Sequence, residues 1–174
     1  MQCLGQKFQN YAAGTGHGYA ATIGGDIGSF HHNLLAHNAG RNWSLGGGLD
    51  GNGYYAGRLD IFNNVVYNWK SRVTDGGAHE VNFVGNYYKE GAGTALHGYT
   101  LRAQFEGTGK GSQAYYYHNN ILQAANGSFT CNGNNDNCGR EYTLSGGQVL
   151  DWEPWNSKPF FASYATVQSA SAAY

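Results

Sequence analysis

The sequence predicts an all-β protein in which short strands stack as a parallel β-helix, or solenoid. One short apolar unit recurs around an asparagine. No segment before residue 160 shows the 3.6-residue apolar period of an amphipathic helix. Few Asn-Gly turns of the kind that joins hairpin strands separate neighbouring strands. An antiparallel β-sandwich, with its asparagines aligned by chance, is the alternative.

The recurring unit is an apolar residue, two further residues, an asparagine and a second apolar residue. Its asparagines are 31, 22 and 34 residues apart, a variation that loops of unequal length would produce in a solenoid. Each unit is too short to bury its own apolar side chains, so it must stack on its neighbours. The asparagines are then expected to form a ladder of amide hydrogen bonds. They are Asn33, Asn64, Asn86 and Asn120.

The other elements are expected in the following order. Residues up to 16 form a loop, and residues 17–23 form a short strand. Beyond the recurring units, residues 141–144 and 148–150 are candidate short strands. Ser163 is expected to cap a helix that runs towards Tyr174. The chain reads as one domain over 1–174 that begins inside a coil and ends inside a helix. It is therefore expected to be a truncated solenoid that self-associates through its N-terminal end.

Composition narrows the class of protein. The chain has 28 glycines, 15% aromatic residues and only 12% charged residues, which is typical of a turn-rich β protein and argues against intrinsic disorder. The net charge of −1 argues against a nucleic-acid partner. No apolar run approaches the ~18 residues of a membrane span.

Cys131 and Cys138 bracket a polar Asn/Gly loop. A local disulfide in a secreted, extracellular protein is the preferred interpretation, and two free thiols are the alternative. No histidine or further cysteine nearby has the spacing of a metal site.

Three motifs follow one another along the chain. They are H-G-Y-A-A-T-I-G-G-D-I-G-S-F-H-H-N-L-L-A-H-N-A-G-R-N from His17, D-I-F-N-N-V-V-Y-N-W from Asp60 and V-N-F-V-G-N-Y-Y-K from Val81. Together they resemble the pectate lyase superfamily, and most strongly the polysaccharide lyases with the signature H-G-x-x-S-L-I-G, HHNL-x-A-H-x-x-R-N-P, NNV-x-YNW. The resemblance covers residues 17–89 and, more loosely, the rest of the chain.

The resemblance implies a right-handed parallel β-helix that cleaves pectate, an α-1,4-linked galacturonan, by β-elimination, usually with Ca²⁺. A cation must neutralise the uronate carboxylate before a base can remove the proton next to it. In the family, an arginine that matches Arg41 is taken as that base, although a guanidinium rarely loses its proton. His17 is the second catalytic candidate, either in the cleft or as a structural histidine at a turn.

The chain departs from the family pattern at several positions. Trp43 stands where the family has proline, and Gly46 stands where a second arginine is expected. Arg58 is the candidate to take over carboxylate binding from that arginine. The family's upstream lysine falls near Tyr19. The acidic calcium ligands belong to coils that this chain does not contain, so the metal ligands are unknown.

The candidate substrate-binding residues carry a positive charge, an imidazole or an aromatic ring. The alternatives are surface charge, a hydrogen-bonded structural histidine and aromatic packing. His31 and His32 are adjacent on a strand and are expected to face opposite ways. The candidates are Tyr19, His31, Trp43, Arg58, Lys70 and Arg72.

The leading function is therefore a polysaccharide lyase that acts on an acidic polysaccharide. A catalytically inactive β-solenoid that binds carbohydrate or serves as a structural module is the second hypothesis. A glycoside hydrolase on the same fold ranks last, because no close pair of carboxylates occurs in the sequence.

Overall fold

The computed structural model describes residues 18–105, 108–145 and 149–174. These residues form fifteen strands and one short helix. The elements are β1 (Thr22–Gly24), β2 (Ile27–His31), β3 (Leu34–Ala36), β4 (Ser44–Gly46), β5 (Arg58–Phe62), β6 (Val65–Tyr67), β7 (Thr74–Gly77), β8 (Glu80–Val84), β9 (Tyr87–Lys89), β10 (Leu101–Phe105), β11 (Ala114–His118), β12 (Ile121–Gln123), β13 (Phe129–Asn132), β14 (Arg140–Leu144), β15 (Trp155–Asn156) and α1 (Ala170–Ala173).

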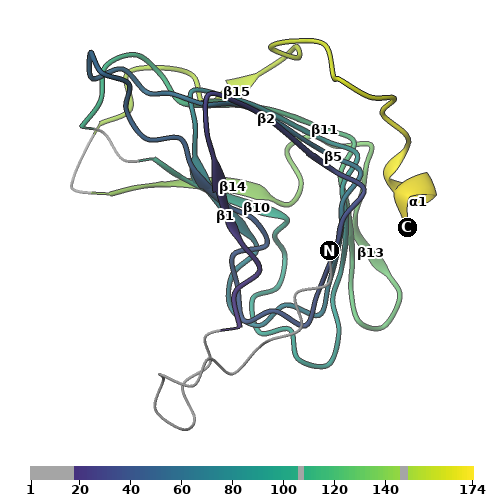
Figure 1. The fold of residues 1–174 in the computed structure, drawn as a ribbon. Coiled ribbons are helices and arrows are strands. Elements are labelled where there is room, and N and C mark those ends of the chain that lie inside the picture. Colours follow the sequence, from purple (N-terminus) through teal and green to yellow (C-terminus); the bar gives the residue numbers. More distant parts are fainter. Residues whose placement is uncertain (1–17, 106–107, 146–148) are drawn as a thin grey trace, which may run out of the picture.

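The strands lie in three sheets of five strands each, arranged around a common interior (Figure 1). The first sheet has the order β1-β4-β7-β10-β14, the second β15-β11-β8-β5-β2 and the third β13-β12-β9-β6-β3. Neighbours within a sheet come from successive coils and pair in parallel, except for the antiparallel pair β12–β13. The parallel solenoid is therefore confirmed, and the antiparallel sandwich is excluded.

The asparagine ladder is also confirmed. Asn33 donates from Nδ2 to Asn64 Oδ1, Asn64 donates in the same way to Asn86, and Asn86 to Asn120. The donor–acceptor distance is 3.0 Å in each case. The same oxygens accept backbone N–H groups of the preceding coil at 2.9–3.2 Å. Asn64, Asn86 and Asn120 are buried. Their amides therefore satisfy one another at a turn that water does not reach.

The interior is filled by side chains that repeat in register from coil to coil. Leu59 pairs with Val81 and then Tyr115, and this row is fully buried. Phe83 and Tyr117, two residues further along, stack with their rings 5.6 Å apart and 11° from parallel. Side chains at the same position of successive coils therefore pack on one another. In this way, coils that are each too short to form a hydrophobic core build a common one.

Residues 156–174, here called the strap, run back over the outer face of the second sheet. Asn82 exchanges hydrogen bonds with the backbone of Phe160 and Phe161 at 3.0 Å. Asn63 does the same with the backbone of Gln168 at 2.7 and 2.8 Å. In Figure 1 the strap leaves β15 and arches along the outside of the sheet to α1. This cover explains why β5 is buried on both of its faces.

The terminal helix is much shorter than expected. Its N-cap is Ser169, not Ser163, and α1 spans only one turn. Ser163 instead donates its hydroxyl to Asp60 Oδ1 at 3.2 Å, which holds this part of the strap against the second sheet. The expected helix from Ser163 was therefore wrong. No helix in the described part of the chain is long and apolar enough to cross a membrane.

Two strand boundaries also differ from expectation. β1 begins at Thr22, so only part of the strand expected over 17–23 is regular, and residue 17 lies outside the described residues. The strand expected over 141–144 is present as β14. Residues 149 and 150 are not in a strand, and residue 148 lies outside the described residues.

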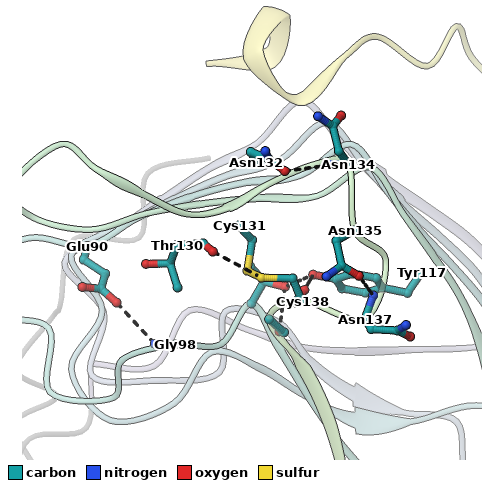
Figure 2. The surroundings of a disulfide bond; sticks show 12 residues. Glu90, Gly98, Tyr117, Thr130, Cys131, Asn132, Asn134, Asn135, Asn137 and Cys138 are labelled. Atoms are coloured by element: carbon teal, nitrogen blue, oxygen red, sulfur yellow. Dashed lines mark hydrogen bonds between the residues drawn. A yellow bond between two sulfur atoms is a disulfide. The ribbon is translucent and has the colours of Figure 1, made fainter.

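The disulfide between Cys131 and Cys138 is present as predicted (Figure 2). Within the loop that it closes, Asn132 and Asn135 each accept a backbone N–H from two residues on, at 3.1 and 3.0 Å. Tyr117, at the end of the interior row, donates its hydroxyl to Cys138 O at 2.8 Å. The loop is therefore fixed both by its own turns and by the core.

Replacing Asn86 with alanine should lower the free energy of unfolding by about 3 kcal/mol, because several buried polar groups would lose their partner. Urea denaturation would measure the change. Asn52→Ala is the control, since this exposed side chain is outside the ladder, and it should stay within about 0.5 kcal/mol of the parent. Equal losses in the two variants would contradict a stabilising ladder.

Burial beneath the strap raises the pKa of the Asp60 carboxyl above its ordinary value of 3.8, against the opposing effect of the Ser163 hydrogen bond. Between 3.8 and the raised pKa, the folded chain binds more protons than the unfolded chain. The free energy of unfolding should therefore fall as the pH rises through that window.

Asp60→Asn removes this titration. The stability of the variant relative to the parent should therefore be higher at pH 7 than at pH 3.5, as measured by urea denaturation at both pH values. A relative stability that does not change, or that changes in the opposite direction, would refute the assignment.

Candidate functional site

The first sheet carries a continuous row of polar side chains on its outer face. Strand register places these residues opposite one another from β1 to β14. The positions next to them, such as Leu45 and Ala103, are buried in the core, so this row faces outward. We call it the outer row. It consists of Thr22, Ser44, Asp75, Arg102 and Glu141.

Arg41 lies at the rim of this face, in the turn that leads into β4. Its backbone has the left-handed φ of 53°. Its Nη1 donates to Thr22 Oγ1 at 3.2 Å, and its guanidinium carbon lies 4.7 Å from the centre of the Tyr19 ring. The buried Nε has no hydrogen-bond partner within the described residues. The guanidinium is thus held by a neutral hydroxyl and a ring.

Arg72 occupies the equivalent turn one coil later, before β7. Its Nε donates to Asp75 Oδ2 at 2.6 Å, and this hydrogen bond raises the pKa of Arg72. Asp75 is only 7% exposed, and its other oxygen is buried without a partner in the described residues. In the next coils, Arg102 pairs with Glu141 and lies 5.3 Å from the Tyr99 ring.

A groove of about 170 Å³ is lined by Arg72 and Asp75 of the first ion pair and by Arg102 of the second. Among its lining residues are Ser71, Arg72, Asp75, Arg102, Gln104 and Thr143. Charges of both signs alternate along it and neutralise each other in pairs. Arg41 differs, because the structure gives it no carboxylate partner within the described residues, whereas Arg58, Arg72 and Arg102 each have one.

The structure brings together only some of the predicted site residues. Tyr19 and Arg41 are in contact. Tyr19 is also close enough to Arg72 to contribute to raising the pKa of Arg72. Lys70 lies two residues before Arg72 in the same turn and is exposed. His17 lies outside the described residues. Tyr19, Arg41 and Arg72 therefore gather at the rim of the first sheet.

Arg58 and His31 lie elsewhere. Both are on the second sheet, where Arg58 pairs with Glu80 at 2.6 Å and lies 4.9 Å from the Phe161 ring of the strap. His31 stacks on Phe62, with ring centres 4.7 Å apart. The expectation that Arg58 replaces the missing second arginine beside Arg41 lacks support from this placement.

Trp43 is 8% exposed and belongs to the core, where its ring lies 5.7 Å from that of Phe30. A ring that stacks on a sugar needs an open face, so Trp43 is corrected to a packing residue. This was the alternative given for it.

The two adjacent histidines do not face opposite ways. Their Nδ1 atoms lie 2.8 Å apart, and both rings contact Phe62. The reason is that β2 ends at His31, while His32 turns with a left-handed φ of 53°. The alternation of a strand therefore stops between them.

The outer row itself was missed, apart from Arg72 beside it. Asp75, Arg102 and Glu141 are ordinary charges in the sequence, and their sequence separations are large. Counted from the ladder asparagines, Ser44 and Asp75 both lie 11 residues on. Arg102 and Glu141 lie 16 and 21 residues on, because longer turns precede them. The ladder alone therefore does not bring them into the row. Placing them there needs the exact length of every turn.

The described residues contain no group of three or more His, Cys, Asp or Glu side chains that could hold a metal ion. The unpaired oxygen of Asp75 is a poor fit to Ca²⁺, because it is buried, Arg72 holds the same carboxylate and Arg102 is its neighbour in the row. Calcium binding therefore stays a prediction from the resemblance.

No family model matches the chain, and no curated protein matches it significantly.

Arg72→Ala should cost about 2 kcal/mol of unfolding free energy, because it leaves a mostly buried carboxylate unpaired. Arg102→Ala is the matched variant. It should cost less than about 1 kcal/mol, since its partner Glu141 keeps 29% of its side-chain surface in water. Urea denaturation of both variants measures the difference, and the reverse order would show that burial of Asp75 is not what separates them.

Proposed function

We propose that this chain is a pectate-lyase-like enzyme that cleaves an acidic polysaccharide, α-1,4-galacturonan, by β-elimination. The proposed scaffold is a right-handed parallel β-helix, and the proposed site is the rim and outer face of the first sheet. The single observation that carries the proposal is the environment of Arg41. It is a cation at the edge of an open sheet face, and no carboxylate in the described residues neutralises it.

This environment suits an anionic sugar. A guanidinium offers five N–H donors, of which the structure engages one with Thr22. Nε is buried, but the remaining donors on Nη1 and Nη2 can bind a uronate carboxylate in the bidentate geometry that guanidinium and carboxylate share. The pairs Arg72–Asp75 and Arg102–Glu141 lie along the groove beyond it and offer polar contacts to neighbouring sugar units.

The chemistry requires removal of the proton on C5, next to the uronate carboxylate. Electrons of the C–H bond form a C4–C5 double bond, the C4–O4 bond breaks, and the leaving oxygen takes up a proton. Binding the carboxylate to a guanidinium stabilises the charge that develops on it. A charged guanidinium that binds the carboxylate cannot also accept the C5 proton. By resemblance Arg41 is the base, which requires its neutral form. If Arg41 binds the carboxylate instead, His17 is the candidate for proton transfer.

A carbohydrate-binding solenoid without catalytic activity is the second candidate. The observation that favours it is that Asp75 and Glu141, the carboxylates of the outer row, are both engaged by arginines. Neither is a free base in this arrangement. Location outside the cell is proposed for either function, and the disulfide supports it, since such bonds persist in oxidising compartments.

The test is incubation with polygalacturonate, with and without Ca²⁺, while the unsaturated product is followed by its ultraviolet absorbance. Arg41→Ala should lower the rate by about 10²-fold or more, as expected for loss of a group that acts on the transition state. Lys110→Ala removes one positive charge far along the chain from this rim and should leave the rate unchanged.

Other outcomes separate the alternatives. Binding of polygalacturonate that Arg41→Ala weakens, without any unsaturated product, would favour the binding module. New reducing ends without the chromophore would indicate a hydrolase. Unsaturated product formed equally well by Arg41→Ala would remove Arg41 from the site.

A further inference from the structure

A second pocket lies at the end of the second sheet, where β11 pairs with β15. Its volume is about 370 Å³, and its walls include Tyr116, His118, Asp136, Arg140, Trp155 and Ser157. These residues belong to neither the outer row nor the rim around Arg41. We propose that this pocket binds a small monoanionic sugar acid, such as a free uronate, with its carboxylate on Arg140. This proposal does not depend on the lyase function.

Arg140 is the anion-binding group. Its guanidinium carbon lies 4.3 Å from the centre of the Trp155 ring and 5.6 Å from that of Tyr117. Like Arg41, it has no carboxylate partner within the described residues, and its side-chain hydrogen bond there goes to the neutral Asn137. Stacking on rings occupies the face of a guanidinium and leaves its in-plane N–H donors, which match a carboxylate bidentately.

His118 and Asp136 also line the pocket. Asp136 Oδ2 lies 2.7 Å from His118 Nδ1, and Oδ1 accepts the backbone N–H of Asn119 at 3.0 Å. Asp136 keeps its negative charge, which disfavours a ligand with more than one negative charge. It favours the tautomer with the proton on Nδ1, so Nε2 of a neutral His118 can accept a hydrogen bond from a hydroxyl group.

Charge and size select the ligand class. The positive charge of Arg140 is opposed by the negative charges of Asp136 and Glu153, so a ligand with one negative charge fits better than a dianion such as phosphate. Ser157 and Asn156 add hydroxyl and amide groups that can bind sugar hydroxyls. The volume lies near the lower end of the roughly 300–1,000 Å³ that is usual for small-molecule sites.

The disulfide loop organises this pocket in advance. Asp136 and Asn137 both lie between Cys131 and Cys138, and Tyr117 ties Cys138 to the core (Figure 2). The two groups that orient His118 and Arg140 thus sit on a covalently closed loop. A site fixed before binding loses less conformational entropy when the ligand arrives.

The experiment is a titration of the full chain with galacturonate, in which the NMR signal of the Trp155 indole N–H is monitored. Galactose serves as the uncharged analogue, and inorganic phosphate serves as the dianion. Galacturonate should give a saturable shift, and galactose and phosphate should bind at least about tenfold more weakly. Arg140→Gln should weaken galacturonate binding at least about tenfold. Arg41→Ala should leave it unchanged, which separates this pocket from the proposed lyase site.

His118→Gln provides a second variant should Arg140→Gln fail to fold, and it should weaken galacturonate binding several-fold. The proposal is overturned if galacturonate gives no saturable shift at Trp155, or if galactose binds as tightly. It is equally overturned if a folded Arg140→Gln or His118→Gln variant binds galacturonate as the parent does.

Discussion

Each coil of this solenoid obtains its backbone hydrogen bonds and its core from the coils on either side, and the asparagine ladder is where that dependence is strictest. The amides of Asn64, Asn86 and Asn120 are buried, so each needs a partner of the same kind at the same height in the next coil. An amide left unpaired there would destabilise the fold, because it would have lost its hydration without gaining a hydrogen bond. The ladder therefore fixes the register of the second and third sheets around it, and the interior rows follow.

The same register builds the outer face of the first sheet. Once the coils are aligned, residues that are far apart in the sequence stand side by side, as Asp75 does with Arg102. Most charges on this face neutralise each other in pairs. The two arginines without a carboxylate partner in the described residues, Arg41 and Arg140, both rest on aromatic rings instead. This contrast led to both proposed sites.

The features that could be predicted from the sequence are those encoded locally. The ladder asparagines recur inside one short unit, and Cys131 and Cys138 enclose a single polar loop, so both were found without any knowledge of the fold. Pairs that depend on turn lengths were not found, for example Arg102 with Glu141. The strap was missed for a related reason. Ser163 has the local signature of a helix cap, but a carboxylate more than a hundred residues earlier takes its hydroxyl.

The burial of Trp43 and the turn at His32 show the same limit. In each case a side chain was expected to be exposed, or to alternate, because of its neighbours in sequence. Its environment is instead set by the end of a strand: β4 begins just after Trp43, and β2 ends just before His32. Local pattern thus predicts which residues form the solenoid, while the ends of the strands decide what its surface presents.

The ladder also has a direction. Asn64 and Asn86 each give a hydrogen to the asparagine of the following coil and accept one from the coil before. Each of these inner rungs therefore presents an oxygen to one side and an N–H to the other. A gene segment that encodes one coil could be duplicated in tandem with the amide hydrogen bonds continued at both new junctions, which gives this architecture a route to longer or shorter forms.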